Sequence, residues 1–376
     1  MHTNTSSPHL PHATSAGDVS AVGDSSTNTE RAPHSEHRKA LTFFAILPSL
    51  LQRSNFIFIQ KGGGSRNKHK KKMSKEEFPI PAAVLKHAQE LGDGDLLVAL
   101  EGASLAAAKI HYHYHAAVPA VEEKPGMHGD LVSVVDREAD EAILGHLRSR
   151  RPGDLILSEE LQPDTRCAEG ERLWIVDPLD GTVGFLFRAS PEYPSTLVAL
   201  RCGGRTLVAV VWFGVTGQVF YAVNGRGAFL NGSPLRVSAD ASRTTLCEAW
   251  VDMNHYSDVL FETAPFTRLR KQLRTKQTGA RLVTSLPAHS GIACHIALGH
   301  KRVHAIVHDN NPANVKQGPW DAAAPQLVLE EAGGVFLNGA TGGQYDPLDT
   351  AGVIVAAASR QLANQILTLL KTPLSE

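Results

Sequence analysis

The chain has 376 residues, 42% of them hydrophobic and 20% charged, which is ordinary for a globular protein of one large or two medium domains. Its net charge of -1 hides an asymmetry, because residues 1–72 hold ten Lys/Arg and four Asp/Glu, which leaves 27 basic and 34 acidic residues in the rest. An acidic body argues against nucleic-acid binding and suits a protein that collects divalent cations. The four cysteines are scattered without a C-x-x-C pair, which disfavours disulfides and zinc and favours a reducing compartment such as the cytoplasm.

Residues 1–80 are predicted to form a disordered N-terminal extension with a basic linker. Residues 1–40 are rich in Ser, Thr, His and Ala and lack apolar periodicity. The apolar stretch 41–59 is interrupted by Pro48 and by the polar residues 52–55, and its uninterrupted part is far shorter than the ~20 residues that span a bilayer. We therefore expect no stable membrane insertion, although organelle targeting by this extension stays open. The glycine-containing basic run 61–75 is typical of a flexible linker.

The first folded domain is predicted to cover residues 81–238. Residues 82–118 are rich in Ala and Leu and indicate helix, broken around residues 92–94, which read Gly-Asp-Gly. The alternating His-Tyr run 111–115 places its histidines around a helix rather than on one face, so we interpret them as surface or packing residues and not as a metal site.

From Leu131 onward the pattern alternates between strand and helix. Asp136 precedes an amphipathic helix, and residues 231–232, Asn-Gly, indicate a tight turn. The strands predicted in the first domain are Leu131–Val135, Leu155–Leu157, Trp174–Val176, Leu197–Leu200, Leu207–Phe213, Gln218–Val223 and Leu235–Val237. The second domain, residues 239–376, is predicted to contain strands at Arg281–Ser285, Val303–Val307 and Gly352–Ala357, and helices at Ser290–Leu298, Ala322–Ala332 and Arg360–Leu370.

One segment, residues 174–182 with the sequence W-I-V-D-P-L-D-G-T, carries the strongest chemical signal in the chain. An apolar strand is predicted to end at Asp177, and Pro178 forces a turn directly after it. Asp180 can then present a second carboxylate to the same place, and the carbonyl group of Leu179 is free to act as a hard oxygen ligand. An Asp-Gly pair alone would indicate only a turn.

Two more acidic residues occur at predicted element ends. Glu159 directly follows a strand, and Asp321 opens a helix. If these carboxylates converge with Asp177 and Asp180, each close pair repels by about 4 kcal/mol at 4 Å and an effective dielectric constant near 20. Only bound cations make such a cluster tolerable, and hard oxygen ligands with open water positions favour Mg²⁺ over zinc.

A different phosphatase chemistry is disfavoured by the spacing. Haloacid-dehalogenase-type enzymes use D-x-D-G-T, with a nucleophilic Asp two residues before the second Asp. Here that position is Pro178, which offers no nucleophile, so a phosphoaspartate mechanism is not expected.

The chain resembles the inositol monophosphatase family, a branch of the lithium-sensitive, metal-dependent sugar and nucleotide phosphatases. The resemblance covers most of residues 82–371 through four segments in family order: Gly129–Ser133 leading to Asp136, Ser158–Glu160, Trp174–Thr182, and Pro319–Asp321 continuing to Glu331–Gly334. It implies an α/β, layered αβαβα sandwich of the inositol monophosphatase or sugar phosphatase type, often assembled as a homodimer, and a phosphoric monoester hydrolase as the function.

The resemblance also implies roles for individual residues. Two or three Mg²⁺ ions would be bound by Glu159, Asp177, the carbonyl group of Leu179, Asp180 and Asp321, with Asp177 bridging two ions. Thr182, supported by Asp136, would orient and deprotonate a metal-bound water, so that Thr182, Asp136 and Glu159 count as catalytic. Glu160 would lie directly behind the ligands. The backbone amides of Gly181 and Thr182, at a predicted helix start, would hold the phosphate.

The substrate is less closely specified by these motifs. An acidic residue contacts substrate hydroxyl groups in the inositol enzymes, and here that position is Asn314; His289 lies where the family has a Gly-Ser/Thr-Ala segment. Gly184 and Phe185 resemble the phosphoadenosine-phosphate nucleotidase branch. We expect inositol monophosphate or a similar polyol phosphate, with a 3′(2′),5′-bisphosphate nucleotide or histidinol phosphate as alternatives. An alternative from a different functional class is a non-catalytic scaffold protein with the same fold.

Overall fold

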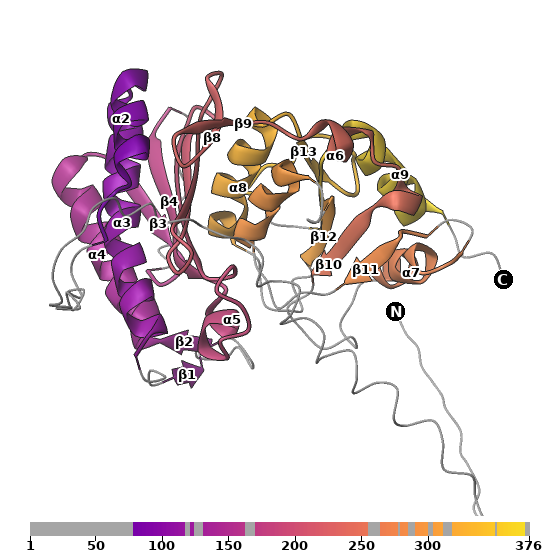
Figure 1. The fold of residues 1–376 in the computed structure, drawn as a ribbon, viewed down its shortest axis with the longest axis horizontal. Helices are drawn as coiled ribbons and strands as arrows, with labels where there is room; N and C mark the ends of the chain where they lie inside the picture. The colour runs from indigo at the N-terminus through magenta and orange to yellow at the C-terminus, as the bar shows by residue number, and fades with distance from the viewer. Residues whose placement is uncertain are drawn as a thin grey trace, which may run out of the picture. The chain divides into compact units, whose positions relative to one another are not determined.

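The described chain is built on two large β-sheets, of seven and five strands, each covered by helices on both faces (Figure 1). The computed structural model describes residues 78–116, 121–123, 131–161, 170–254, 264–276, 279–284, 290–299, 304–310, 318–349 and 352–372, all within one compact unit, Lys71–Glu376. The apolar stretch 41–59 and almost all of the predicted extension lie outside these residues. None of the helices in the described residues has the length and apolar character needed to cross a bilayer.

A layer of three helices covers the first sheet: α2 (Ala82–Leu91), α3 (Gly94–Tyr114) and α4 (Val134–Arg150). The predicted break between α2 and α3 is confirmed. Gly92 adopts a left-handed conformation with φ 65°, which ends α2. Asp93 then caps α3, because its carboxylate accepts hydrogen bonds from the amides of Asp95 and Leu96, both at 3.0 Å.

The predicted strand Leu131–Val135 is two residues too long. Strand β2 ends at Ser133, and α4 begins at Val134. Ser133 caps this helix: its hydroxyl accepts from the amide of Val135, while its own amide donates to Asp136 at 2.8 Å. The cap therefore takes Val134 and Val135 into helix despite their preference for strands. β2 (Leu131–Ser133) pairs with β1 (Val121–Glu123).

The first sheet has seven strands in the order β3-β4-β5-β6-β7-β8-β9. β3 and β4 are parallel and the other neighbours are antiparallel. Both faces of the sheet are buried, which explains the near-continuous apolar runs of its central strands. The bounds are β3 Leu155–Ser158, β4 Arg172–Asp180, β5 Ser195–Cys202, β6 Arg205–Phe213, β7 Gln218–Val223, β8 Gly227–Leu230 and β9 Ser233–Leu235.

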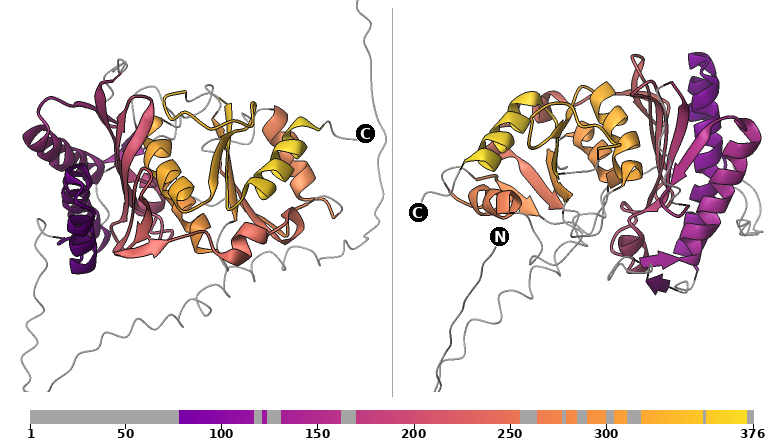
Figure 2. Two further views of the ribbon diagram at one scale, coloured as in Figure 1. Left: turned by 90° about the horizontal axis from the view of Figure 1, so that it is seen from above. Right: turned by 180° about the vertical axis from the view of Figure 1, so that it is seen from behind.

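A middle layer, α8 (Pro319–Glu331) and the 3₁₀ helix η3 (Ser290–Leu298), packs between the two sheets (Figure 2). Helix α8 supplies Leu327 to the core against the first sheet and Leu329 to the core against the second. Its last residue, Glu331, accepts the amides of Gly225 at 2.7 Å and Gly227 at 2.8 Å, which fastens this end of α8 to the β7–β8 turn.

The second sheet has the order β11-β10-β12-β14-β13, and α7 (Ala264–Leu273) and α9 (Arg360–Lys371) cover its outer face. Its strands are β10 Trp250–Asn254, β11 Leu282–Thr284, β12 Ala305–Asn310, β13 Val335–Asn338 and β14 Gly352–Ala357. Three short helices complete the description: α5 (Thr182–Leu186), α6 (Ala239–Arg243) and the 3₁₀ helix η1 (Leu246–Glu248). The predicted αβαβα order of layers is confirmed, whereas the domain boundary at residue 238 stays a prediction.

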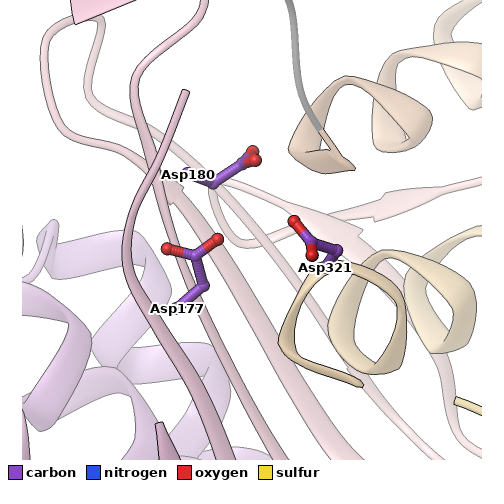
Figure 3. Close-up of side chains that lie close together, drawn as sticks. All are labelled: Asp177, Asp180 and Asp321. Carbon is purple, nitrogen blue, oxygen red and sulfur yellow. The ribbon is translucent and has the colours of Figure 1, made fainter. Parts of the chain in front are cut away.

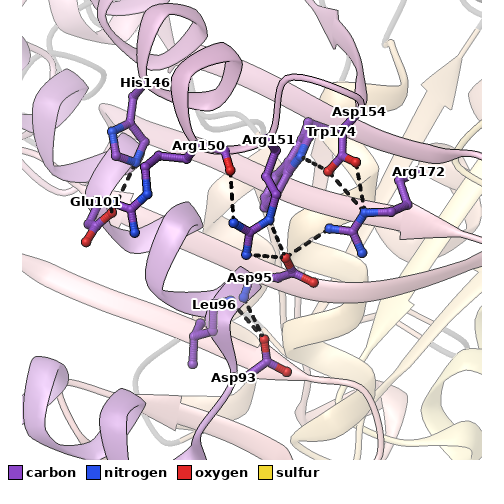
Figure 4. A network of polar contacts seen from close by, with 10 residues as sticks. All are labelled: Asp93, Asp95, Leu96, Glu101, His146, Arg150, Arg151, Asp154, Arg172 and Trp174. Carbon is purple, nitrogen blue, oxygen red and sulfur yellow. Dashed lines mark hydrogen bonds and ion pairs between the residues drawn. The ribbon is translucent and has the colours of Figure 1, made fainter.

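A polar network fixes the start of β4 against the helices (Figure 4). Arg172 donates through Nε to both carboxylate oxygens of Asp154, at 2.9 and 3.1 Å, and through a terminal nitrogen to Asp95 at 2.9 Å. The indole nitrogen of Trp174 also donates to Asp154, at 2.8 Å. Burial alone would raise the pKa of Asp95, but hydrogen bonds from Arg172 and Arg151 lower it below its ordinary value.

Candidate metal centre

Three carboxylates that are distant in sequence meet where β4 ends and α8 begins (Figure 3). Asp177 and Asp180 are at the end of β4, and Asp321 is in the first turn of α8. One oxygen of each carboxylate lies within 4.8 Å of the others, and all three residues are buried, at 1%, 2% and 7% exposure. The predicted convergence of these three residues is therefore observed.

An irregularity in β4 lets Asp177 and Asp180 face the same place. Residues three apart in a regular strand point to opposite faces of the sheet. Asp177 lies opposite Leu197 and Asp180 opposite Ser195, so β4 contains one more residue than β5 between these pairs. This bulge, at Pro178 and Leu179, reverses the alternation and turns the second carboxylate towards the first.

Hydrogen-bond donors hold Asp180 and Asp321 in place. Asp180 accepts from the hydroxyl of Ser195 at 2.9 Å and from the amides of Ser290 at 3.0 Å and Gly291 at 2.8 Å. Asp321 accepts from the amide of Gly318 at 2.7 Å and the hydroxyl of Ser290 at 3.1 Å. A carboxylate has about four lone-pair positions, so Asp321, which accepts these two hydrogen bonds, keeps lone pairs for a further ligand.

The charged groups that raise the pKa values in this cluster are acidic. Burial raises the pKa of Asp177 well above its ordinary value, and the negative charges of Glu159, Asp180 and Asp321 raise it further. Burial likewise raises the pKa of Asp321, followed by the charges of Glu159 and Asp180. After burial, the groups that raise both pKa values are other acids, which is the electrostatic signature of a site that needs a positive ion.

The donor set fits a hard divalent cation. It consists of buried carboxylate oxygens, without a sulfur or imidazole ligand among the three clustered residues. Glu159 belongs to the same group electrostatically, since a hydrogen bond with Glu159 is among the causes that raise the pKa of Asp177. The carbonyl oxygen of Leu179, a predicted ligand, is at the bulge and lies 3.1 Å from the hydroxyl oxygen of Thr182.

Thr182 and Asp136 are joined directly beside this cluster. The Thr182 hydroxyl lies 2.7 Å from Oδ1 of Asp136, and Oδ2 of Asp136 accepts the amide and hydroxyl of Ser133 at 2.8 and 2.6 Å. Burial raises the pKa of Asp136 to about 6, and the charge of Glu160 adds to the rise. The cap that starts α4 thus also orients the carboxylate that receives the Thr182 hydroxyl.

The remaining predicted residues divide into two groups. Gly181 precedes α5 with φ 85°, a conformation that favours glycine, and Glu160 is half-buried near Asp136. His289 and Asn314, the predicted substrate contacts, lie outside the described residues. The His111–His115 run contributes no metal group: among the described residues only the three aspartates form one, and His113 pairs instead with Glu138 at 3.0 Å.

Sequence reasoning missed the residues that hold the carboxylates. Ser195, Ser290 and Gly291 contact Asp180, yet Ser290 and Gly291 are 110 and 111 residues away from it in sequence. Ser158 donates to Asp140 on α4, which fixes the residue before Glu159. Serine and glycine at a strand start or helix start are common without any site, so no sequence signal could have singled them out.

A layered αβαβα fold with an acidic cluster between its first sheet and middle helices defines the class of metal-dependent phosphatases. The sequence model of the inositol monophosphatase family matches residues 95–373, and the chain belongs to this family. As a member it is a phosphatase, a phosphoric monoester hydrolase, of a metal-dependent and typically lithium-sensitive family that acts on small phosphorylated substrates.

Individual relatives support the same assignment. The chain is 33% identical over 221 residues to a fructose-1,6-bisphosphatase/inositol-1-monophosphatase of Thermotoga maritima, covering 59% of this chain and 76% of that protein. It is 30% identical over 225 residues to a histidinol-phosphatase of Chlorobaculum parvum, covering 60% and 78%. The crystal structure of the extragenic suppressor protein suhB from Bartonella henselae matches with a TM-score of 0.61 and 25% identity, over 75% of this chain and all of that one.

Proposed function

We propose that the protein is a Mg²⁺-dependent phosphomonoesterase that hydrolyses a small phosphorylated polyol, with inositol monophosphate as the leading substrate. The observation that carries the proposal is the convergence of Asp177, Asp180 and Asp321 in a buried cluster, in which neighbouring acids raise the pKa of Asp177 and of Asp321. Hydrolysis of a phosphomonoester requires little covalent work from the protein, so alignment and charge stabilisation suffice.

Five groups would hold two or three Mg²⁺ ions: the carboxylates of Glu159, Asp177, Asp180 and Asp321 and the carbonyl oxygen of Leu179. Bound there, the cations would supply positive charge for the phosphoryl oxygens and the leaving alkoxide and would acidify the attacking water. The hydrogen bonds from Ser195, Ser290 and Gly318 support this role, because they fix the carboxylates before any cation arrives.

Thr182 and Asp136 would take the proton of the attacking water. The Thr182 hydroxyl donates to Asp136 at 2.7 Å, so its oxygen is left free to accept a hydrogen bond from a water molecule. The water would thus be oriented by Thr182, and the ionised Asp136 would receive the proton through the hydroxyl. Glu160 would raise the basicity of Asp136, since its charge contributes to the raised pKa.

The phosphate group would lie against the backbone amides of Gly181 and Thr182. Gly181 is buried, and its left-handed conformation at the junction of β4 and α5 turns the chain away immediately after Asp180. No phosphoenzyme would be needed, because the water would attack the phosphorus directly. We also propose a homodimer, on the family resemblance alone.

Inositol monophosphate leads because the family model and a relative carry that activity in their names. Histidinol phosphate is the second candidate, supported by the histidinol-phosphatase relative at 30% identity. A bisphosphate nucleotide rests on the Gly184-Phe185 resemblance alone. The substrate pocket, including His289 and Asn314, would decide among them.

A phosphate-release panel tests the proposal. The purified chain is assayed with inositol 1-phosphate, histidinol phosphate and 3′-phosphoadenosine 5′-phosphate, with Mg²⁺, with a chelator, and with Mg²⁺ plus Li⁺. We expect Mg²⁺-dependent turnover that Li⁺ inhibits, with the highest kcat/KM for inositol 1-phosphate. Preference for either alternative would replace the substrate and leave the chemistry intact. Absence of turnover on every phosphomonoester would overturn the proposal and favour the scaffold.

A further inference from the structure

The Arg188 side chain joins the ends of two helices. Its guanidinium group donates to the carbonyl oxygens of Phe185, at the end of α5, at 3.0 Å and of His113, at the end of α3, at 2.9 Å. The same group lies over the aromatic rings of Tyr114 and Phe185, at 4.6 and 4.9 Å from their centroids. One side chain thus caps the carbonyl ends of both helices and stacks on a ring from each.

The backbone of Arg188 adopts the left-handed conformation that closes the end of α5. Its φ is 52°, in the left-handed region that non-glycine residues rarely adopt. The amide of Arg188 donates to the carbonyl of Phe185 at 3.2 Å, and the amide of Ala189 donates to the carbonyl of Gly184 at 3.0 Å, which is the hydrogen-bond pattern of a helix end closed by a left-handed residue. The side chain of Arg188 adds its contacts with Phe185 to a helix end that the backbone has already closed.

Helix α5 depends on such an anchor because it has only five residues. A helix of this length is unstable by itself and takes its position from tertiary contacts. At one end Thr182 donates to Asp136, and at the other end Phe185 and Leu186 are buried in a small cluster together with Leu179. Arg188 closes this cluster from the side of Tyr114.

We infer that Arg188 is a positioning residue that fixes α5 and, through α5, sets the Thr182 hydroxyl against Asp136 and the Leu179 carbonyl group. The expected effect of Arg188 on catalysis rests on the proposed function, whereas the positioning of α5 by Arg188 does not. Arg188 touches neither the carboxylate cluster nor Asp136 in any contact that the described residues show. Its effect on the reaction therefore passes through α5.

The test compares Arg188→Lys with a matched control, Arg226→Lys. Arg226 also donates to a carbonyl group at the end of a helix, that of Leu91 in α2, at 2.8 Å, but it contacts no part of α5. Lysine keeps the charge and loses the planar fork and the stacking. Amide hydrogen exchange of residues 181–187, kcat and KM are measured in the Mg²⁺-bound enzyme. Each arginine substitution is made both in the wild-type chain and in a chain that carries Thr182→Ala.

We expect R188K to accelerate amide exchange in residues 181–187 about tenfold. We also expect it to lower kcat by about 10- to 100-fold with KM little changed, because a small displacement of a catalytic group slows the reaction more than it weakens substrate binding. R226K should change neither quantity. In the T182A background, R188K should lower kcat by less than twofold, because the group that it positions is already absent. Should R188K not fold, Tyr114→Leu removes the ring beneath the guanidinium and replaces it in the same test.

The outcomes separate this inference from the proposed function. Unchanged exchange at residues 181–187 in R188K would overturn the inference, whatever the activity. An equal loss of kcat in the wild-type and T182A backgrounds would also overturn it, because Arg188 would then act elsewhere. Faster exchange together with full activity of T182A supports the positioning by Arg188 and contradicts the proposed role of Thr182.

Discussion

The hydroxyl group of Ser290 donates a hydrogen bond to Oδ1 of Asp321 at 3.1 Å, while the amide of the same residue donates to Asp180 at 3.0 Å. One residue at the start of η3 therefore holds two acidic side chains that come from β4 and from α8. Its two donors can be separated experimentally, since a substitution to alanine removes the hydroxyl and keeps the amide.

Ser290→Ala should weaken Mg²⁺ binding by about tenfold and leave the protein folded, because residues that orient metal ligands typically contribute 10- to 100-fold to affinity. Calorimetric titration of the protein with Mg²⁺ and the Mg²⁺ dependence of kcat measure this change. Ser242→Ala is the matched control, since the Ser242 hydroxyl donates only to the carbonyl of Ala239 at an exposed site. Equal Mg²⁺ affinity in S290A and S242A would show that the Ser290 hydroxyl does not orient a ligand.

Asp177→Asn should abolish activity while the protein stays folded. A loss of more than tenfold, about 1.4 kcal/mol of barrier, is the minimum expected of a ligand in the centre of the site. With a chelator present, D177N should unfold at a higher temperature than the wild type, because burial and three neighbouring acids make the Asp177 charge costly there. Thermal unfolding and phosphate release provide the two readouts, and Asp240→Asn on α6 serves as the exposed control. A D177N enzyme retaining a tenth or more of the wild-type rate would contradict the assignment.

Gly291→Ala should disturb the same site by steric means. A Cβ atom on Gly291 would lie 2.3 Å from the Ser195 hydroxyl oxygen and 3.0 Å from Oδ2 of Asp180, so both must move. We expect about a tenfold or greater loss of Mg²⁺ affinity. Gly145→Ala is the control: it lies in α4, meets no atom within 4 Å, and should stabilise the protein by about 0.5–1 kcal/mol. Full Mg²⁺ affinity in G291A would contradict this prediction, because it would show that the Asp180 carboxylate can move without weakening Mg²⁺ binding.

Asp136 should set the acidic limb of the pH–rate profile. Burial raises its pKa to about 6, so the carboxyl group is protonated below that pH and cannot accept a proton from Thr182. The rate kcat should therefore fall as the pH decreases through about 6, and Asp136→Asn should remove this limb along with most of the activity. A profile of unchanged shape in D136N would assign the limb to another group.

The same shift has a consequence for stability. The folded protein binds the Asp136 proton more tightly than the unfolded chain, whose pKa is near 3.8. The contribution of this proton to the free energy of unfolding is therefore complete below pH 3.8 and is lost as the pH rises through about 6. Unfolding of D136N, measured with a chelator, should accordingly vary less with pH over this interval than unfolding of the wild type.

The centre was predictable from sequence where its signals are local. Asp177, Leu179 and Asp180 share one segment that ends a strand, and Asp321 opens a helix, so local pattern located all four. Their meeting was a long-range inference that local pattern could not establish, because it depends on α8 packing against the first sheet. The bulge in β4 was equally hidden, since it is defined by the register with β5.

Other features depend on contacts that a single sequence does not reveal. Strand β10, Trp250–Asn254, was not predicted, because buried Asp252 interrupts its apolar pattern; in the structure, Asp252 accepts a hydrogen bond from the hydroxyl of Thr284 on β11. The predicted helix Ser290–Leu298 is present but is a 3₁₀ helix. Helix α5 is too short for any periodicity to show, and it takes its position from Arg188 and Asp136.

The placement of Asp180 on a strand and Asp321 on a helix of the next layer makes a bound cation a cross-link. An ion shared by these two side chains would close a loop of chain that runs from residue 180 to residue 321. A link that closes a long loop removes much conformational freedom from the unfolded chain. The bound ion would therefore favour the folded form through the lower entropy of the unfolded chain as well as by neutralising charges in the folded state. Mg²⁺ would then be a component of the folded architecture as much as a reagent.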